Sequence, residues 1–130
     1  MVVELEGELC SGLGEGAIFT EIDWVARAFR ERLGFIPYPG TLNLSLSGDD
    51  WAQARALLCR VPGIPIEPPP GFCAAKCFAV TLNECVDGAA VLPDVADYPA
   101  DKFEIVAPVA VRRELGLQDG DRVRLRVKIR

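Results

Sequence analysis

Residues 2–19 read VVELEGELCSGLGEGAIF and join two patterns of different kinds. In residues 2–10, apolar and acidic side chains alternate, which predicts a strand with one buried face. Glycines then occupy positions 12, 14 and 16, and they bring no side chain to bury. Such a stretch makes positive φ accessible and lets several N–H groups turn toward one anion. The sequence therefore predicts a strand that runs into an anion-binding loop.

A helix is predicted to follow this loop, with Thr20 as its N-cap and Gly34 at its end. Phe19 is placed to pack against Trp24 as a hydrophobic staple. The positive end of the helix would face whatever the loop holds, so we interpret the loop as a phosphate cradle. A tight strand–helix turn without a ligand is the alternative, because this glycine spacing matches neither the dinucleotide fingerprint nor the Walker A loop.

The rest of the chain is predicted to contain more strands than helices. Strands are expected at 41–46, 74–82, 89–92, 102–106 and 121–130, and helices at about 50–59 and 108–115. A turn is expected at Asp87-Gly88, while 62–71 and 93–101 are expected to be irregular. Short connections between strands favour a mainly β (α+β) fold, a small closed or nearly closed barrel with peripheral helices.

Composition narrows the class of protein. The 130 residues are expected to form one domain, 1–130, and no apolar run approaches the roughly 20 residues of a membrane helix. The first residues lack a signal-peptide pattern, so we expect a cytoplasmic protein with no membrane partner. A net charge of −5 disfavours sequence-independent nucleic-acid binding. The basic residues at 122–130 are interpreted as the solvated face of a strand.

Two residue types bear on catalysis and redox chemistry. The chain has no histidine, which excludes Ser-His-Asp and Cys-His catalysis and imidazole-dependent zinc sites. Its five cysteines form no C-x-x-C pair and are expected to be buried free thiols. A disulfide is the alternative if the source is a hyperthermophile.

Polar residues in two predicted strands are candidate ligands. Thr41 and Asn43 are two residues apart, so both side chains face the same side of their strand. A hydroxyl and an amide oxygen suit Mg²⁺ when phosphate oxygens complete the shell, and a hydrogen-bonded polar face is the alternative. Glu104 is a single carboxylate in an apolar strand. It would pair with a neighbour, accept hydrogen bonds from a ligand or act as a general base.

Several segments taken together resemble one known family. They are Ser11–Gly16, Leu33-Gly34-Phe35 with Pro37–Leu44, Asp87-Gly88-Ala89 with Pro93, Glu104–Pro108, and Leu117-x-Asp119-Gly120-Asp121. In this order and at these intervals they are similar to the archaeal CTP-dependent riboflavin kinases. The resemblance spans nearly the whole chain and is weakest between about Gly48 and Phe72.

The resemblance implies a six-stranded cradle-loop β barrel, and we expect a monomer. It implies transfer of the γ-phosphate of CTP to the ribityl 5′-hydroxyl of riboflavin, giving FMN and CDP with Mg²⁺. Thr41 and Asn43 would ligate the metal, Ala96 and Glu104 would contact the flavin, and Asn43 and Glu104 would be catalytic. The residues implied to bind nucleotide are Leu13, Gly14, Glu15, Gly16, Ala17 and Ile18, together with Val109, Ala110, Val111 and Arg112.

This chain departs from the family pattern at two positions. Ala96 stands where family members carry a threonine, so the alternatives Asp97 and Tyr98 are kept for the flavin contact. Ala17 stands where members tend to carry a basic residue, which leaves more of the phosphate charge to Mg²⁺ and Arg112. Two other functions are therefore kept as alternatives. One is a flavin- or nucleotide-binding module without catalysis, and the other is a cradle-type barrel that acts as a DNA-binding regulator.

Overall fold

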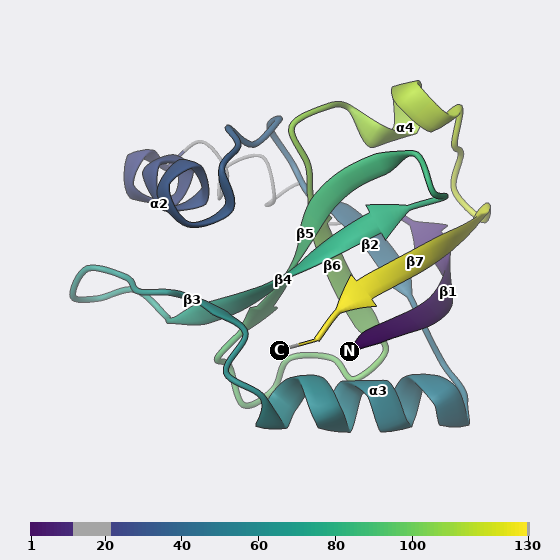
Figure 1. The fold of residues 1–130 in the computed structure, drawn as a ribbon, viewed down its shortest axis with the longest axis horizontal. Helices are drawn as coiled ribbons and strands as arrows, with labels where there is room; N and C mark the ends of the chain where they lie inside the picture. Colours follow the sequence, from purple (N-terminus) through teal and green to yellow (C-terminus); the bar gives the residue numbers. More distant parts are fainter. Residues whose placement is uncertain (12–21, 130) are drawn as a thin grey trace.

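The computed structural model describes residues 1–11 and 22–129. Seven strands and three helices form within these ranges (Figure 1). In chain order they are β1 (Val2–Cys10), α2 (Asp23–Leu33), β2 (Leu42–Ser45), α3 (Asp49–Arg60), β3 (Ile64–Ile66), β4 (Ala75–Leu82), β5 (Val86–Pro93), β6 (Lys102–Val106), α4 (Val111–Leu115) and β7 (Arg122–Lys128).

Six of these strands close into an antiparallel barrel. The sheet order is β3-β4-β5-β6-β2-β1-β7, and β7 also pairs with β4, which joins the two sides of the sheet. The remaining strand, β3, extends the sheet outside the barrel by pairing with β4 alone. The expected six-stranded barrel with peripheral helices is confirmed.

Alternating burial explains why these segments form barrel strands. Along β1 and β7, apolar side chains face the core while the charged residues between them stay exposed. The barrel interior contains Leu9, Leu44, Phe103 and Leu125, all of them almost fully buried. Because every second residue of a strand lies on the same face, the pairing register places the apolar residues of neighbouring strands together in the barrel interior.

The helices cover the barrel from different sides (Figure 1). Trp51 and Leu58 of α3, and Val111 of α4, belong to the same core cluster as the barrel interior. Val25 and Phe29 of α2 belong to a second cluster with residues of β3–β6, on the outer side of the sheet. The helix predicted after the loop is confirmed and ends at Gly34, whose φ of 82° allows the left-handed cap.

The turn predicted at Asp87-Gly88 is wrong. The hairpin between β4 and β5 turns at Asn83 and Glu84, which have positive φ of 48° and 57°, and β5 runs straight through Asp87 and Gly88. A Cβ at Gly88 would lie 2.6 Å from the Val106 carbonyl oxygen. Gly88 therefore allows the backbones of β5 and β6 to approach each other closely, and it does not form a turn.

Three other boundaries also differ from expectation. Residues 64–66, expected to be irregular, form β3. Helix α4 begins at Val111, so Pro108 precedes it by a short turn instead of opening it. Helix α2 has Ile22 as its N-cap rather than Thr20; Thr20 and Phe19 lie outside the described residues.

All five cysteines are free thiols, as expected, but the expectation that they are buried holds only for Cys77. Cys59, Cys73 and Cys85 are exposed, and Cys10 is half-buried. Among the described residues, no helix combines the length and apolar character needed to cross a bilayer.

Candidate functional site

Asn43 and Glu104 are direct neighbours on the outer face of the barrel. Asn43 of β2 pairs with Glu104 of β6 in the antiparallel register, and Asn43 pairs with Cys10 of β1 on its other side. The flanking residues Phe103 and Ile105 belong to the interior core, so the Glu104 side chain lies on the opposite face. Two candidates from separate segments are thus brought together.

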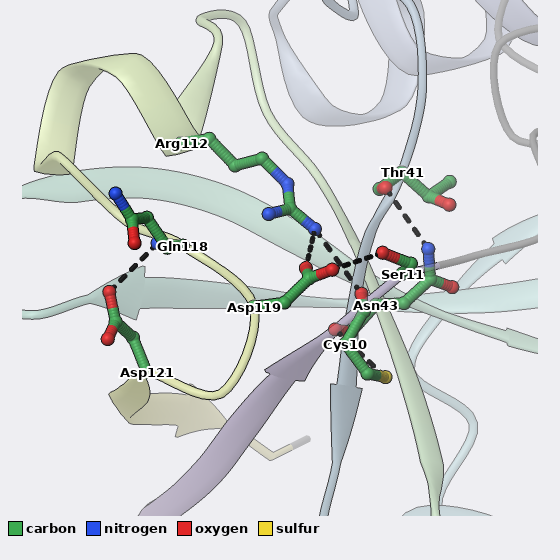
Figure 2. Close-up of polar contacts among 8 residues, drawn as sticks. All are labelled: Cys10, Ser11, Thr41, Asn43, Arg112, Gln118, Asp119 and Asp121. Carbon is green, nitrogen blue, oxygen red and sulfur yellow. Dashed lines mark hydrogen bonds and ion pairs between the residues drawn. The ribbon is translucent and has the colours of Figure 1, made fainter.

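The Asn43 side chain has a defined orientation. It is 9% exposed, and its amide nitrogen donates to the Thr41 carbonyl oxygen at 3.3 Å (Figure 2). That bond commits the nitrogen, so the amide oxygen is the atom of Asn43 that can ligate a cation. Hard neutral oxygens, with a carboxylate on the adjacent strand, fit the preferences of Mg²⁺. No cluster of three acidic or cysteine side chains exists among the described residues, so a ligand would supply further oxygens.

Glu104 has two partners that differ in kind. The Tyr98 hydroxyl donates to Glu104 Oε1 at 2.9 Å, and the Lys102 ammonium lies 2.9 Å from the same oxygen. Burial, together with the negative charge of Glu104, raises the pKa of Tyr98, so its hydroxyl stays protonated as a donor. Lys102 was not predicted as a site residue, although its position two residues before Glu104 in the same strand places both side chains on one face.

Ala96 lines a cavity whose lining does not include Glu104. It lies with Tyr98, Arg55 and Lys76 around a cavity of about 490 Å³ at one side of the loop that precedes β6. Of the two alternatives kept at this loop, Tyr98 contacts Glu104, whereas Asp97 is exposed. The structure thus connects the loop to Glu104 through Tyr98.

A second cavity unites two predicted segments. Residues 38–42, which include Thr41, and residues 109–112, which were implied to bind nucleotide, line a pocket of about 230 Å³. Gly40 has a φ of 108°, a conformation that favours glycine and turns the chain into β2. The backbone N–H of Tyr38 donates to Ala107 O at 2.7 Å and joins the two walls of the pocket.

Arg112 reaches from α4 to the end of β1 (Figure 2). Its Nη2 lies 2.7 Å from Asp119 Oδ1 and 3.4 Å from the Cys10 carbonyl oxygen. Ser11 donates to the other oxygen of Asp119. The hydrogen bonds from Ser11 and Arg112 lower the pKa of Asp119. Asp119 was quoted above only within a motif, and its contact with Ser11 spans 108 positions of sequence.

The glycine loop itself lies outside the described residues. The candidates Leu13, Gly14, Glu15, Gly16, Ala17 and Ile18 are therefore located only by their position in the sequence, directly after Ser11. Ser11 is described and lies within hydrogen-bonding distance of Asp119, beside the α4 wall of the pocket. The loop is thus attached where Arg112 meets the end of β1.

Another cavity, of about 470 Å³, lies between the β1–β7 pair and α3. Its arginines already have acidic partners: Arg126 is 3.2 Å from Glu4, and both Arg124 and Arg126 are 3.9 Å from Glu84. Paired charges leave little attraction for an anion. We therefore place the candidate site at the Thr41–Arg112 pocket and the adjoining Asn43–Glu104 pair.

Comparison with known proteins bears on this site. A family model named CTP-dep_RFKase, with the description "Domain of unknown function DUF120", matches residues 9–127. The chain belongs to this family. The matched range contains every candidate site residue named above.

Curated relatives carry the name riboflavin kinase. The chain is 44% identical to one from Pyrobaculum calidifontis over 96% of its own length and 60% of the relative's. It is 39% identical to one from Methanosarcina barkeri, over 98% of the chain and 57% of the relative. A third, from Archaeoglobus fulgidus, is 39% identical over 96% and 54%. The chain thus spans somewhat more than half the length of the curated relatives it matches.

Proposed function

We propose that this protein is a CTP-dependent riboflavin kinase, which transfers the γ-phosphoryl group of CTP to the ribityl 5′-hydroxyl of riboflavin and releases FMN and CDP. The observation that carries this proposal is the pairing of Asn43 with Glu104, which directly follow and precede Leu42 and Ile105 in the sequence, two residues that line the pocket with 38–41 and 109–112. The family's name and the names of its curated relatives support the same reaction.

On the donor side, residues 13–18 would surround the phosphates with backbone N–H groups, and residues 109–112 would contact the cytidine. The Arg112 guanidinium at the pocket wall would supply positive charge to the phosphates. Phosphoryl transfer asks the protein mainly to position the reactants and to stabilise the charge of the transition state.

Thr41 and Asn43 would hold Mg²⁺ together with phosphate oxygens. When bound, this ion would neutralise negative charge on the phosphates and orient them for in-line attack. The Asn43 amide is fixed by its bond to Thr41 O, so its oxygen would be held in place before the ligand arrives.

On the acceptor side, Glu104 would receive the ribityl hydroxyl. Both described contacts of its carboxylate end on Oε1, which leaves Oε2 to accept the hydroxyl proton. Tyr98 and Lys102 would keep the carboxylate oriented toward Asn43 and the donor phosphate. Ala96 would contribute only to the wall of the neighbouring cavity.

Incubation of the purified chain with riboflavin, Mg²⁺ and CTP, followed by chromatographic detection of FMN and CDP, tests the proposal. We expect equimolar FMN and CDP with CTP, much less product with ATP, and none when EDTA removes the metal. Riboflavin or CTP binding without FMN formation would instead support a binding module. Tight binding to labelled DNA at low salt, without FMN formation, would support a DNA-binding regulator.

A further inference from the structure

Asp119 joins three segments that are far apart in the sequence. One carboxylate oxygen accepts from Arg112 at the start of α4, and the other accepts from Ser11 at the end of β1 (Figure 2). Asp119 itself belongs to the turn that precedes β7. A carboxylate has room for both bonds because each of its oxygens accepts independently.

The backbone holds this turn in place. The Gly120 N–H donates to Leu9 O at 2.7 Å, and the Leu9 N–H donates to Asp121 O at 2.8 Å. Asp121 also accepts from the Gln118 N–H at 2.8 Å, which closes the turn on itself. Asp119 is therefore presented to Ser11 and Arg112 from a turn whose backbone is hydrogen-bonded to β1, although its side chain is exposed.

The contacts of Arg112 use one end of its guanidinium. Its bonds to Asp119 and to the Cys10 carbonyl oxygen both involve Nη2. The Nε and Nη1 groups carry three more N–H donors in the same plane. The residue lines the pocket between residues 38–42 and 109–112, so a fixed Nη2 orients these donors relative to that pocket.

We propose that Asp119 is a positioning residue for the nucleoside triphosphate, because it holds the Arg112 guanidinium ready to bind phosphate. This inference rests on the proposed function. A free arginine side chain would lose its rotational freedom on binding, whereas one held by Asp119 has already lost it. Asp119 thus favours CTP binding despite carrying the same sign of charge as the phosphates.

The test is a double-mutant cycle on Asp119→Ala, Arg112→Ala and the double variant, with CTP and CDP affinities measured by titration calorimetry and KM and kcat for CTP measured by FMN formation. We expect Asp119→Ala to weaken nucleotide binding about three- to tenfold, the cost of ordering one long side chain, with kcat nearly unchanged. In the Arg112→Ala background, Asp119→Ala should have no further effect, because Asp119 acts through Arg112.

Glu6→Ala is the matched control. Glu6 forms an ion pair with Arg122 at the same distance of 2.7 Å, and neither residue lines the pocket. We expect this variant to bind CTP like wild type. Thermal unfolding of every variant separates loss of binding from loss of fold, and Asp119→Glu should restore part of the affinity.

Three results would overturn the inference. Tighter CTP binding by Asp119→Ala would show that the carboxylate only repels or competes with phosphate. Unchanged binding would show that the contact is structural. Equal losses in the wild-type and Arg112→Ala backgrounds would show that Asp119 does not act through Arg112. If the proposed function fails, the wild-type chain itself neither binds CTP nor forms FMN, which is distinct from all three.

Discussion

Asn43 and Glu104 face each other across β2 and β6, with the Asn43 amide turned toward Thr41 and the Glu104 carboxylate held by Tyr98 and Lys102. The pair places an amide oxygen, the proposed ligand of a cation, next to a carboxylate, the proposed acceptor of a proton. In the proposed reaction, the donor phosphate and the ribityl hydroxyl would meet there.

Asn43→Ala should lower kcat for FMN formation by orders of magnitude and leave the fold intact. The change removes the fixed amide oxygen while the neighbouring leucines still fill the core. Steady-state kinetics at several Mg²⁺ concentrations, with circular dichroism, provide the measurement. Ser45→Ala, two residues further along the same strand face, is the control. Wild-type turnover by Asn43→Ala would refute the metal assignment.

Tyr98→Phe should raise KM for riboflavin by about tenfold or more, as expected for losing one hydrogen bond to a charged group. The Tyr98 ring remains and keeps its packing, so only the bond to Glu104 is lost. Thr81→Val removes a comparable hydroxyl–carboxylate bond, 3.0 Å long, to Asp87, and should leave KM unchanged. If both variants leave KM for riboflavin unchanged, the Tyr98 hydroxyl does not contribute to riboflavin binding.

Gly88→Ala should destabilise the protein by about 1–3 kcal/mol, as overpacking of a dense site does. The new Cβ would meet the Val106 carbonyl oxygen, which belongs to the backbone of β6 and has little freedom to move. At Gly7 the nearest atom is a Leu46 side-chain carbon at 3.0 Å, which can shift, so Gly7→Ala should cost less. Chemical denaturation measures both, and the reverse order would contradict the close approach of β5 and β6.

Cys77 should resist thiol reagents in the folded protein. Burial raises its pKa to about 12, whereas Cys59, Cys73 and Cys85 are exposed. Native labelling should therefore modify the exposed thiols first, and Cys77 only after unfolding. Because the folded-state pKa lies above the unfolded one near 9, stability falls as pH rises from 9 toward 12. Cys77→Ala should remove that part of the loss, and rapid native labelling of Cys77 would contradict the structure.

The parts of the fold that were predictable are those with local causes. In β1 and β7, every second side chain faces water, and this alternation can be read from the sequence directly. The buried face of α2 and its Gly34 cap likewise depend only on residues of the helix itself. The Asp87-Gly88 turn was mispredicted because two adjacent turn signals compete in the sequence. The chain turns at Asn83 and Glu84. Gly88 is needed because the Val106 carbonyl oxygen, 18 positions away in the sequence, leaves no room for a Cβ.

The site divides in the same way. Thr41 and Asn43 were chosen from their spacing alone; in the structure β2 begins at Leu42, so Thr41 directly precedes the strand that contains Asn43, and their role as metal ligands stays a prediction. The pairing of Asn43 with Glu104 depends on strand register, and the contact of Glu104 with Tyr98 depends on the path of the loop before β6. The contact of Glu104 with Lys102 follows from their spacing in one strand. The Asp119–Ser11 contact joins opposite ends of the chain, so no local pattern marks it. The roles proposed for residues 13–18 stay predictions.

Nuclear magnetic resonance mapping is the most direct test of whether nucleotide binds in the pocket between residues 38–42 and 109–112. The ¹⁵N-labelled protein would be titrated with CDP and Mg²⁺, and backbone amide shifts would be followed residue by residue. If CDP binds in this pocket, the largest changes will occur at residues 40–43 and 109–112, which line or adjoin it. Changes confined to the cavity beside Glu4 and Arg126, or none at saturating CDP, would contradict binding in this pocket.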